Sequence, residues 1–351
     1  MQDKQEIFEA VGAQYRKLVR RRMVLLTVLF VSVLAAFCVD IAVGPSMLNV
    51  GDVISIILSP AQADAGSRVI VWDIRLPYSV MAILVGAALS LAGAEMQTIL
   101  NNPLASPFTL GVSAAASFGA ALSIILNIGI PGVPDEWMIA GNAFLFAFGS
   151  VLLLQTLSRL RGARVESIVL FGIAMVFTFN ALTGIVQYIA SAEALQQMIF
   201  WSMGSLVRSD WNKIQLLCIV LIVIVPFSLA SSWKMTALRL GEDSARSYGV
   251  NVKRLRFTSL LRVSILSATA VAFVGTIGFI GLVGPHIARL LTGEDHRYFL
   301  PASILSGALV MSLASIVSKA LVSGVVMPVG IVTALIGVPV FVVLILSKRS
   351  R

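Results

Sequence analysis

Charged side chains are scarce in this sequence. Asp, Glu, Lys and Arg make up 12% of the 351 residues, whereas apolar residues make up 58%. That balance excludes an ordinary soluble domain. Apolar runs of about 20 residues, long enough to cross a bilayer as a helix, recur along the chain. Since a bilayer core offers no water to backbone groups, such runs are expected to be helical. The sequence therefore predicts an all-α polytopic membrane protein.

Cysteine and histidine are almost missing, and nucleotide-binding motifs are wholly missing. Cys38 and Cys218 each stand alone in an apolar run, which predicts small buried side chains. His286 and His296 have no Cys or carboxylate at metal-ligand spacing, so no metal site is expected. The dipeptide Gly-Lys does not occur, which excludes a Walker-type phosphate loop. No catalytic constellation stands out. We expect no enzyme and no bound cofactor, so another chain or an ion gradient would power any active transport.

Eight apolar runs are long enough to be single membrane spans. They lie near residues 23–43, 78–99, 107–128, 138–158, 167–190, 213–232, 301–322 and 329–347. The stretch 257–291 is too long for one ordinary span and short for two. It also contains four glycines and a proline that can break a helix, Gly275, Gly278, Gly281, Gly284 and Pro285.

The distribution of basic residues decides how often 257–291 crosses, because cytoplasmic loops are enriched in Lys and Arg. Residues 1–22 end in RKLVRRR and are predicted to be a cytoplasmic segment. With two crossings, all 26 Lys and Arg residues lie inside except Arg68, Arg75, Arg208, Lys213 and Lys319. The prediction is a single ten-helix domain over 23–347 with both termini in the cytoplasm. The net charge of +9 then reflects topology and not nucleic-acid binding.

An uncharged polar stretch, LNNPLASPFTLGV at residues 100–112, separates the second and third predicted spans. Pro103 and Pro107 end one helix and start the next. Asn101 and Asn102 can cap exposed backbone groups. Residues 100–106 thus predict a turn on the cytoplasmic side. A plain capped turn and a functional hinge fit these residues equally well.

The longest charged segment, residues 233–256, also falls on the predicted cytoplasmic side. Gly241 followed by two acids favours a helix start. Gly249 can end that helix in the left-handed conformation, and Asn251 can cap a second short helix. Two short helices with a glycine elbow suit docking of a soluble partner. A solvated basic loop that only fixes topology is the alternative.

Few ionisable side chains fall within the predicted spans. Asp40, Glu95 and Lys319 are the candidates, and all lie near span ends. An intramembrane carboxylate such as Glu95 indicates a functional site, pairs with a cation or reaches interfacial water. These residues leave an ion-coupled secondary transporter open as an alternative class. Residues 191–206 predict an external amphipathic helix.

Four long segments carry a family pattern. They read RLPYSVMAILVGAALSLAGAEMQTILNNPLASPFTLGVSAAASFGAAL, LGEDSARSYGVNVKRLR, GFIGLVGPHIARLLTGEDHRYFLPASILSGA and MPVGIVTALIGVPVFVVLIL. In this order, from about residue 70 to 347, the chain resembles the FecCD family of ABC importer permeases. The resemblance implies a type II ABC importer permease fold with ten spans. It also implies import of a ferric siderophore, haem or cobalamin, of which an iron(III)-siderophore is the expected substrate.

By position, the resemblance assigns roles to single residues. A cytoplasmic gate would consist of Asn102, Leu104, Val165 and Glu166. A segment that couples the permease to an ATPase would include Gly241, Glu242, Ala245, Arg246 and Gly249. Cations that dock a substrate-binding protein would be Arg75 and Lys319, with Arg68 a weaker candidate. The chain departs from the family at Tyr78 and Asn101, where the family often has Arg.

The resemblance also implies partners. They are a second permease subunit, identical or paralogous, two ATPase subunits that hold ATP and Mg, a substrate-binding protein, and the substrate chelate. The expected location is the bacterial cytoplasmic (inner) membrane, in contact with lipid.

Overall fold

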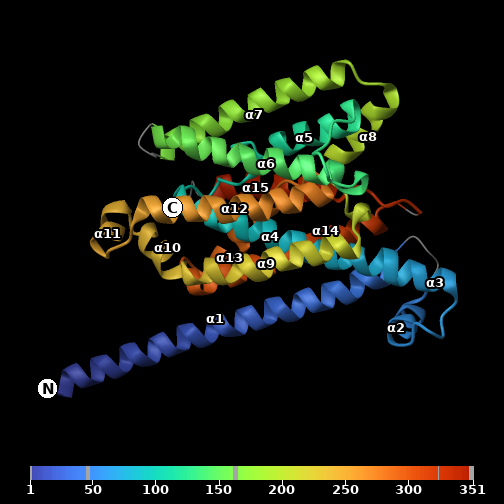
Figure 1. Ribbon diagram of the computed structural model, residues 1–351. Helices are drawn as coiled ribbons and strands as arrows, with labels where there is room; N and C mark the ends of the chain where they lie inside the picture. Colours follow the sequence, from blue (N-terminus) through green and yellow to red (C-terminus); the bar gives the residue numbers. More distant parts are fainter. Residues whose placement is uncertain (1, 45–47, 161–164, 323, 348–351) are drawn as a thin grey trace.

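The computed structural model of the chain is all-helical, and it describes residues 2–44, 48–160, 165–322 and 324–347 (Figure 1). Seven helical stretches in this part of the chain are long and apolar enough to cross a membrane. They are Gly12–Ala42, Ala65–Ile99, Asp135–Leu157, Val165–Tyr188, Trp211–Ala230, Val252–Val274 and His296–Ala320. Three shorter apolar helices accompany them, at Val112–Leu126, Ile280–Thr292 and Val329–Pro339. A polytopic membrane protein is confirmed, while the count of ten spans stays a prediction.

The helices follow one another with short connections. They are α1 (Gln2–Ala42), α2 (Val50–Leu58), α3 (Ala65–Val69), α4 (Leu76–Ile99), α5 (Val112–Leu126), α6 (Asp135–Leu160), α7 (Val165–Tyr188), α8 (Ala192–Ser202), α9 (Trp211–Ala230), α10 (Ser232–Arg239), α11 (Glu242–Ser247), α12 (Val252–Val274), α13 (Ile280–Thr292), α14 (His296–Ala320) and α15 (Val329–Ser347). A π-helical stretch, Ile70–Arg75, joins α3 to α4, and single 3-10 turns lie at Phe108–Leu110 and Leu206–Arg208.

The two ends of the bundle differ (Figure 1). The start of α1, the end of α15, and α10 with α11 lie at one end, which we call the predicted cytoplasmic end. Helices α2, α3 and α8 lie at the other. The predicted helix near 191–206 therefore exists as α8, with the Ser191 hydroxyl accepting from the Ala194 amide at its start. The sequence analysis missed α2 and α3.

The first helix differs from its prediction. Residues 1–22 were expected to be a separate cytoplasmic segment, but α1 runs from Gln2 to Ala42 without a break. The apolar run simply continues a helix that begins in the polar segment, because neither proline nor glycine interrupts it near residue 22. The loop cations Arg161 and Arg164 and the tail cations Lys348, Arg349 and Arg351 lie outside the described residues.

The stretch 257–291 does form two helices. α12 ends at Val274 and α13 begins at Ile280, after a break in which Gly275 has φ 78° and Phe279 has φ 66°. Glycine adopts such positive φ values without steric cost. α13 has only 13 residues, as expected for a short span beside a break.

A seam of glycines fixes α4 against α13 and α14. A Cβ added to Gly93 would lie 1.9 Å from the carbonyl oxygen of Gly281 in α13, and one added to Gly86 would lie 2.4 Å from that of Gly307 in α14. The backbones therefore approach more closely than any larger residue allows. The Ser90 hydroxyl also donates to the Ser303 carbonyl at 2.6 Å. Nearly every residue of α4 is buried as a result.

Candidate functional site

The turn after α4 is held by its own asparagines. Asn101 adopts φ 46°, a left-handed conformation that Asn tolerates better than most residues. The Asn102 amide donates to the Gln97 carbonyl at 3.0 Å, and its side-chain oxygen accepts from the Leu104 amide at 2.9 Å. The predicted capping role is thus confirmed for Asn102, whereas the Asn101 side-chain oxygen accepts a hydrogen bond from Arg239 instead. Leu104, a predicted gate residue, is 43% exposed.

The two other predicted gate residues lie at the start of α7. Val165 is half-buried and Glu166 is exposed. α7 contacts the segment beyond the turn, where an added Cβ on Gly172 would lie 2.7 Å from the Leu110 side chain. This contact lies about two helical turns beyond Val165, since each turn spans 3.6 residues. A gate formed by Leu104 with Val165 and Glu166 stays a prediction.

The coupling segment has a glycine at each joint. Gly241, with φ 108°, separates α10 from α11, and Gly249, with φ 78°, follows α11. Asn251 accepts a hydrogen bond from the Arg254 amide at 2.9 Å and caps α12. The second short helix expected after Asn251 is wrong, because α12 continues as a long apolar helix. The two short helices that flank a glycine elbow are instead α10 and α11, with Gly241 between them.

Ala245 anchors α11 to the rest of the protein, because it is completely buried. Arg246, by contrast, is exposed, and in the described part of the chain its ion pairs stay within α11, 3.3 Å from Glu242 and 3.9 Å from Asp243. Glu242 also forms an ion pair with Arg256 at the start of α12. The exposed face of α11 thus presents Arg246 and Asp243, while Glu242 is engaged inward.

Two arginines connect the coupling segment to the turn after α4. Arg239, the last residue of α10, donates from Nη1 to the Asn101 side-chain oxygen at 2.6 Å. Arg256 donates from Nε to the carbonyl of Ile99, the last residue of α4, at 3.2 Å. The sequence analysis missed both connections, because each joins residues more than a hundred positions apart and no local pattern indicates it.

A shared carboxylate reinforces this junction. Glu294 accepts two hydrogen bonds from Arg239, at 2.8 and 3.1 Å, and lies 3.0 Å from Arg289 Nε. Arg289 also donates to the Gln97 side chain at 3.1 Å. α4, α10 and the end of α13 are therefore joined by charge-assisted hydrogen bonds, which are stronger than neutral ones.

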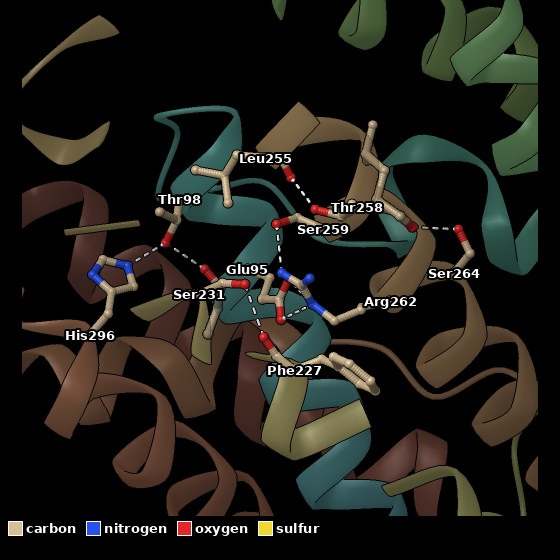
Figure 2. A network of polar contacts seen from close by, with 12 residues as sticks. Glu95, Thr98, Phe227, Ser231, Leu255, Thr258, Ser259, Arg262, Ser264 and His296 are labelled. Carbon is tan, nitrogen blue, oxygen red and sulfur yellow. Dashed lines mark hydrogen bonds and ion pairs between the residues drawn. The ribbon is translucent and has the colours of Figure 1, made fainter. Parts of the chain in front are cut away.

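The carboxylate of Glu95 lies deeper in the bundle (Figure 2). It is fully buried and receives three hydrogen bonds from Arg262, between 2.8 and 3.1 Å. Arg262 also donates to the Ser259 hydroxyl at 2.9 Å. Arg262 had been counted among the cytoplasmic cations, but it lies about three turns inside α12 and is buried. Of the alternatives considered for Glu95, the structure supports pairing with a cation and not contact with interfacial water.

The predicted docking cations Arg75 and Lys319 are both buried. Arg75 donates to the carbonyls of Ile41 and Ala42, at 3.1 and 2.9 Å, and so caps the end of α1. Lys319 lies 2.7 Å from the buried carboxylate of Asp40. Neither guanidinium nor ammonium group has the exposed position that docking requires. Arg68 is exposed, and its docking role stays a prediction.

The Asp40–Lys319 pair has a small polar surrounding. The Ser315 hydroxyl donates to Asp40 at 2.6 Å, and the Lys319 ammonium lies 4.8 Å from the centre of the Tyr78 ring. The Tyr78 hydroxyl lies 3.0 Å from that of Ser318. Tyr78, which replaces a family Arg, thus supports a buried ion pair between α1 and α14.

The bundle of apolar helices has broken and short members, a buried ion pair near each end, and a glycine-jointed elbow at the predicted cytoplasmic end. These features are those of a polytopic membrane protein of the transporter class. The chain belongs to the FecCD transport family, whose model matches residues 30–347. That membership confirms the predicted family.

Relatives and solved structures agree with this assignment. The chain is 38% identical to an ABC transporter permease protein of Methanocaldococcus jannaschii, over 94% of this chain and 95% of that protein. It is 36% identical to the hemin transport system permease protein HmuU of Yersinia pestis, over 80% of this chain and 84% of that protein. A solved structure described as an inward-facing metal-chelate type ABC transporter matches with a TM-score of 0.80 and 30% identity, covering 92% of this chain and 99% of that chain.

Proposed function

We propose that this chain is the membrane subunit of an ABC importer that carries an iron(III)-siderophore or a similar bulky metal chelate. The observation that carries the proposal is the junction of the coupling segment with the turn after α4, through Arg239 and Arg256. A permease powered by a separate ATPase needs such a path, because force applied at the docking segment must reach the substrate pathway.

The absence of a Walker-type motif supports the division of labour. ATP and Mg would be held by two ATPase subunits that dock on α10 and α11. A second permease subunit would complete the pathway, and a substrate-binding protein would deliver the chelate at the end that carries α2, α3 and α8. The family and the apolar helices support location in the bacterial inner membrane.

An ion-coupled secondary transporter is the second candidate, and the buried carboxylates Asp40 and Glu95 are the observation in its favour. Each, however, is paired with a cation inside the fold, Asp40 with Lys319 and Glu95 with Arg262. A carboxylate that binds and releases a transported ion would have to exchange that ion against the permanently paired Lys or Arg. We therefore favour the ATP-driven importer.

Reconstitution of this chain with candidate ATPase subunits and a candidate substrate-binding protein tests the proposal. Uptake into vesicles should require ATP, persist when ion gradients are dissipated, and favour a ferric siderophore over haem and cobalamin. ATP-independent uptake that follows a proton or sodium gradient would establish the second candidate instead. Uptake of haem or cobalamin alone would retain the importer and change only its substrate.

A further inference from the structure

A groove of about 450 Å³ lies where α9 ends and α12 begins. Its lining includes Phe227 and Ala230 of α9, Lys234 of α10, and Arg254, Thr258 and Arg262 of α12. No acidic side chain of the described residues lines it. Gly249, Val250 and Asn251, which follow α11 at the end of the coupling segment, also line the groove, so the groove adjoins that segment, whereas the turn after α4 does not contribute to it.

The groove carries positive charge that the protein does not neutralise. Lys234 and Arg254 are exposed, and neither side chain forms a hydrogen bond or ion pair with the described part of the chain. Arg262 contributes little, because Glu95 accepts its hydrogen bonds. The amino end of α12 adds partial positive charge at the same place. An anion such as a phosphate group is the chemically matched occupant.

The surface beyond the groove is apolar and faces away from the bundle. On α9, the exposed side chains of Phe227, Val223 and Ile219 follow one another at helical spacing and lead away from the groove. They are 62%, 50% and 56% exposed, respectively. A helix predicted to span the membrane presents such a stripe to lipid chains.

A second, apolar pocket lies farther along the same helix. It has a volume of about 290 Å³ and is lined by α6, α9 and α12, including Trp137, Val220 and Phe273. Ala230 and Val220 are ten residues apart, which is about 15 Å along a helix axis. That distance is about half of the roughly 30 Å hydrocarbon core of a bilayer. The apolar pocket therefore lies at the depth that an acyl chain reaches from a headgroup in the groove.

We propose that the groove binds one anionic phospholipid, with its phosphate between Lys234 and Arg254 and an acyl chain along α9 toward the apolar pocket. A soluble phosphate would use the cations but leave the apolar stripe and pocket unexplained. Basic pockets between helices at the cytoplasmic side are suited to anionic headgroups. The lipid would bridge α9, α10 and α12 beside the coupling segment.

Native mass spectrometry tests the proposal. The assembled transporter is exchanged into phosphatidylglycerol or phosphatidylcholine, and the amount of each lipid that stays bound is measured. The unaltered protein should retain phosphatidylglycerol in preference to phosphatidylcholine. The Lys234→Ala/Arg254→Ala variant should lose that preference by about tenfold or more, since basic residues near an anionic surface contribute additively. The charge-preserving variant Lys234→Arg/Arg254→Lys should keep it, which separates lost binding from lost folding.

A matched control removes two exposed cations that do not line the groove, Lys17→Ala/Lys253→Ala. It should retain phosphatidylglycerol as the unaltered protein does. An equal loss in this control, or unchanged retention when Lys234 and Arg254 are replaced, would overturn the proposal. Binding of inorganic phosphate that depends on the two cations, without any preference between the two lipids, would also overturn it and assign the groove to a soluble anion. If the permease alone retains the lipid but the complex with its ATPases does not, the proposal is also overturned, and the groove would be part of the ATPase interface.

Discussion

Arg239 and Asn101, 138 residues apart, are joined by a 2.6 Å hydrogen bond that ties the end of α10 to the left-handed residue after α4. If the ATPase acts through α10 and α11, this bond is a direct connection from α10 to the turn. Arg239→Ala should therefore reduce transport per ATP hydrolysed by between about twofold and thirtyfold, the range of coupling free energies that single residues carry. ATPase docking should persist.

Coupled uptake and ATP hydrolysis in proteoliposomes measure this effect. Arg246→Ala is the comparison variant for docking, because Arg246 lies on the exposed face of α11 and, among the described residues, pairs only with Glu242 and Asp243. Normal coupling in the Arg239 variant would remove the proposed path. A defect that is equal in the Arg246 variant would assign the effect to docking.

Leu104 is expected to close the pathway, since it is the only large apolar side chain between Asn101 and Pro107. Leu104→Gly should let a small reporter leak through reconstituted permease without nucleotide, whereas Leu104→Trp should slow transport and leave ATPase docking intact. Passive flux measurements decide the matter. Val165 and Glu166 could mask a partial leak, so the triple change to Gly is the decisive version. A tight baseline in that variant would leave the turn a plain helix connection.

Gly249 is expected to require a positive φ and no particular space. Its φ is 78°, and no atom lies within 4 Å of an added Cβ. Gly249→Val should therefore strain the elbow by at least about 1–2 kcal/mol, and both uptake and ATPase co-purification should fall while membrane insertion persists. Gly249→Asn should be milder, because Asn tolerates the left-handed region. Equal loss in both variants would indicate that space and not conformation matters.

For the Glu95–Arg262 pair, we expect a single substitution to lower the stability of the fold more than the double substitution does. Arg262→Met should destabilise the fold by about 3–5 kcal/mol, because it leaves a buried carboxylate without a counter-ion. Glu95→Leu combined with Arg262→Met should recover much of that loss. Thermal unfolding in detergent compares the two. A double variant that is no more stable than the single one would mean that Glu95 has a further partner or role.

We expect replacement of Asp295 to lower the stability of the protein by an amount that depends on pH. Hydrogen bonds from the Arg297 side chain, together with the charge of Arg22, lower the pKa of the Asp295 carboxyl. A lowered pKa in the folded state stabilises the protein above the unfolded value of about 4, and the benefit is lost as pH falls through the folded value. Asp295→Asn keeps a helix-capping side chain but removes the charge. Its deficit in melting temperature should be present at pH 7 and shrink below about pH 4; a constant deficit would contradict the assignment.

Sequence patterns were sufficient for features that depend on local chemistry. Apolar runs located the long helices, the glycines at 275–284 indicated the break after α12, and Gly249 was correctly expected to follow a short helix. Asn251 was correctly expected to cap a helix. These outcomes follow from backbone conformation and burial, which neighbouring residues determine.

Partners across the bundle could not be predicted in the same way. The sequence indicates that Glu95 is costly in a membrane, but not that Arg262, 167 residues away, neutralises it. Arg75 and Lys319 were assigned to the outer surface from the distribution of basic residues and from the family resemblance, and each is instead buried against a specific acceptor, the end of α1 or Asp40. The helices α2 and α3 were missed because nine and five residues are too short for a clear apolar period.

The contacts among Gly86, Gly93, Gly281 and Gly307 limit how the pathway can open. With no side chain between these backbones, α4 packs in close contact with α13 and α14. We therefore expect the three helices to move together, and Asn101 to move with them. Any relative displacement at the turn has to be absorbed after Leu104, on the side of α5 to α7, where Gly111 with φ 87° is a suitable pivot.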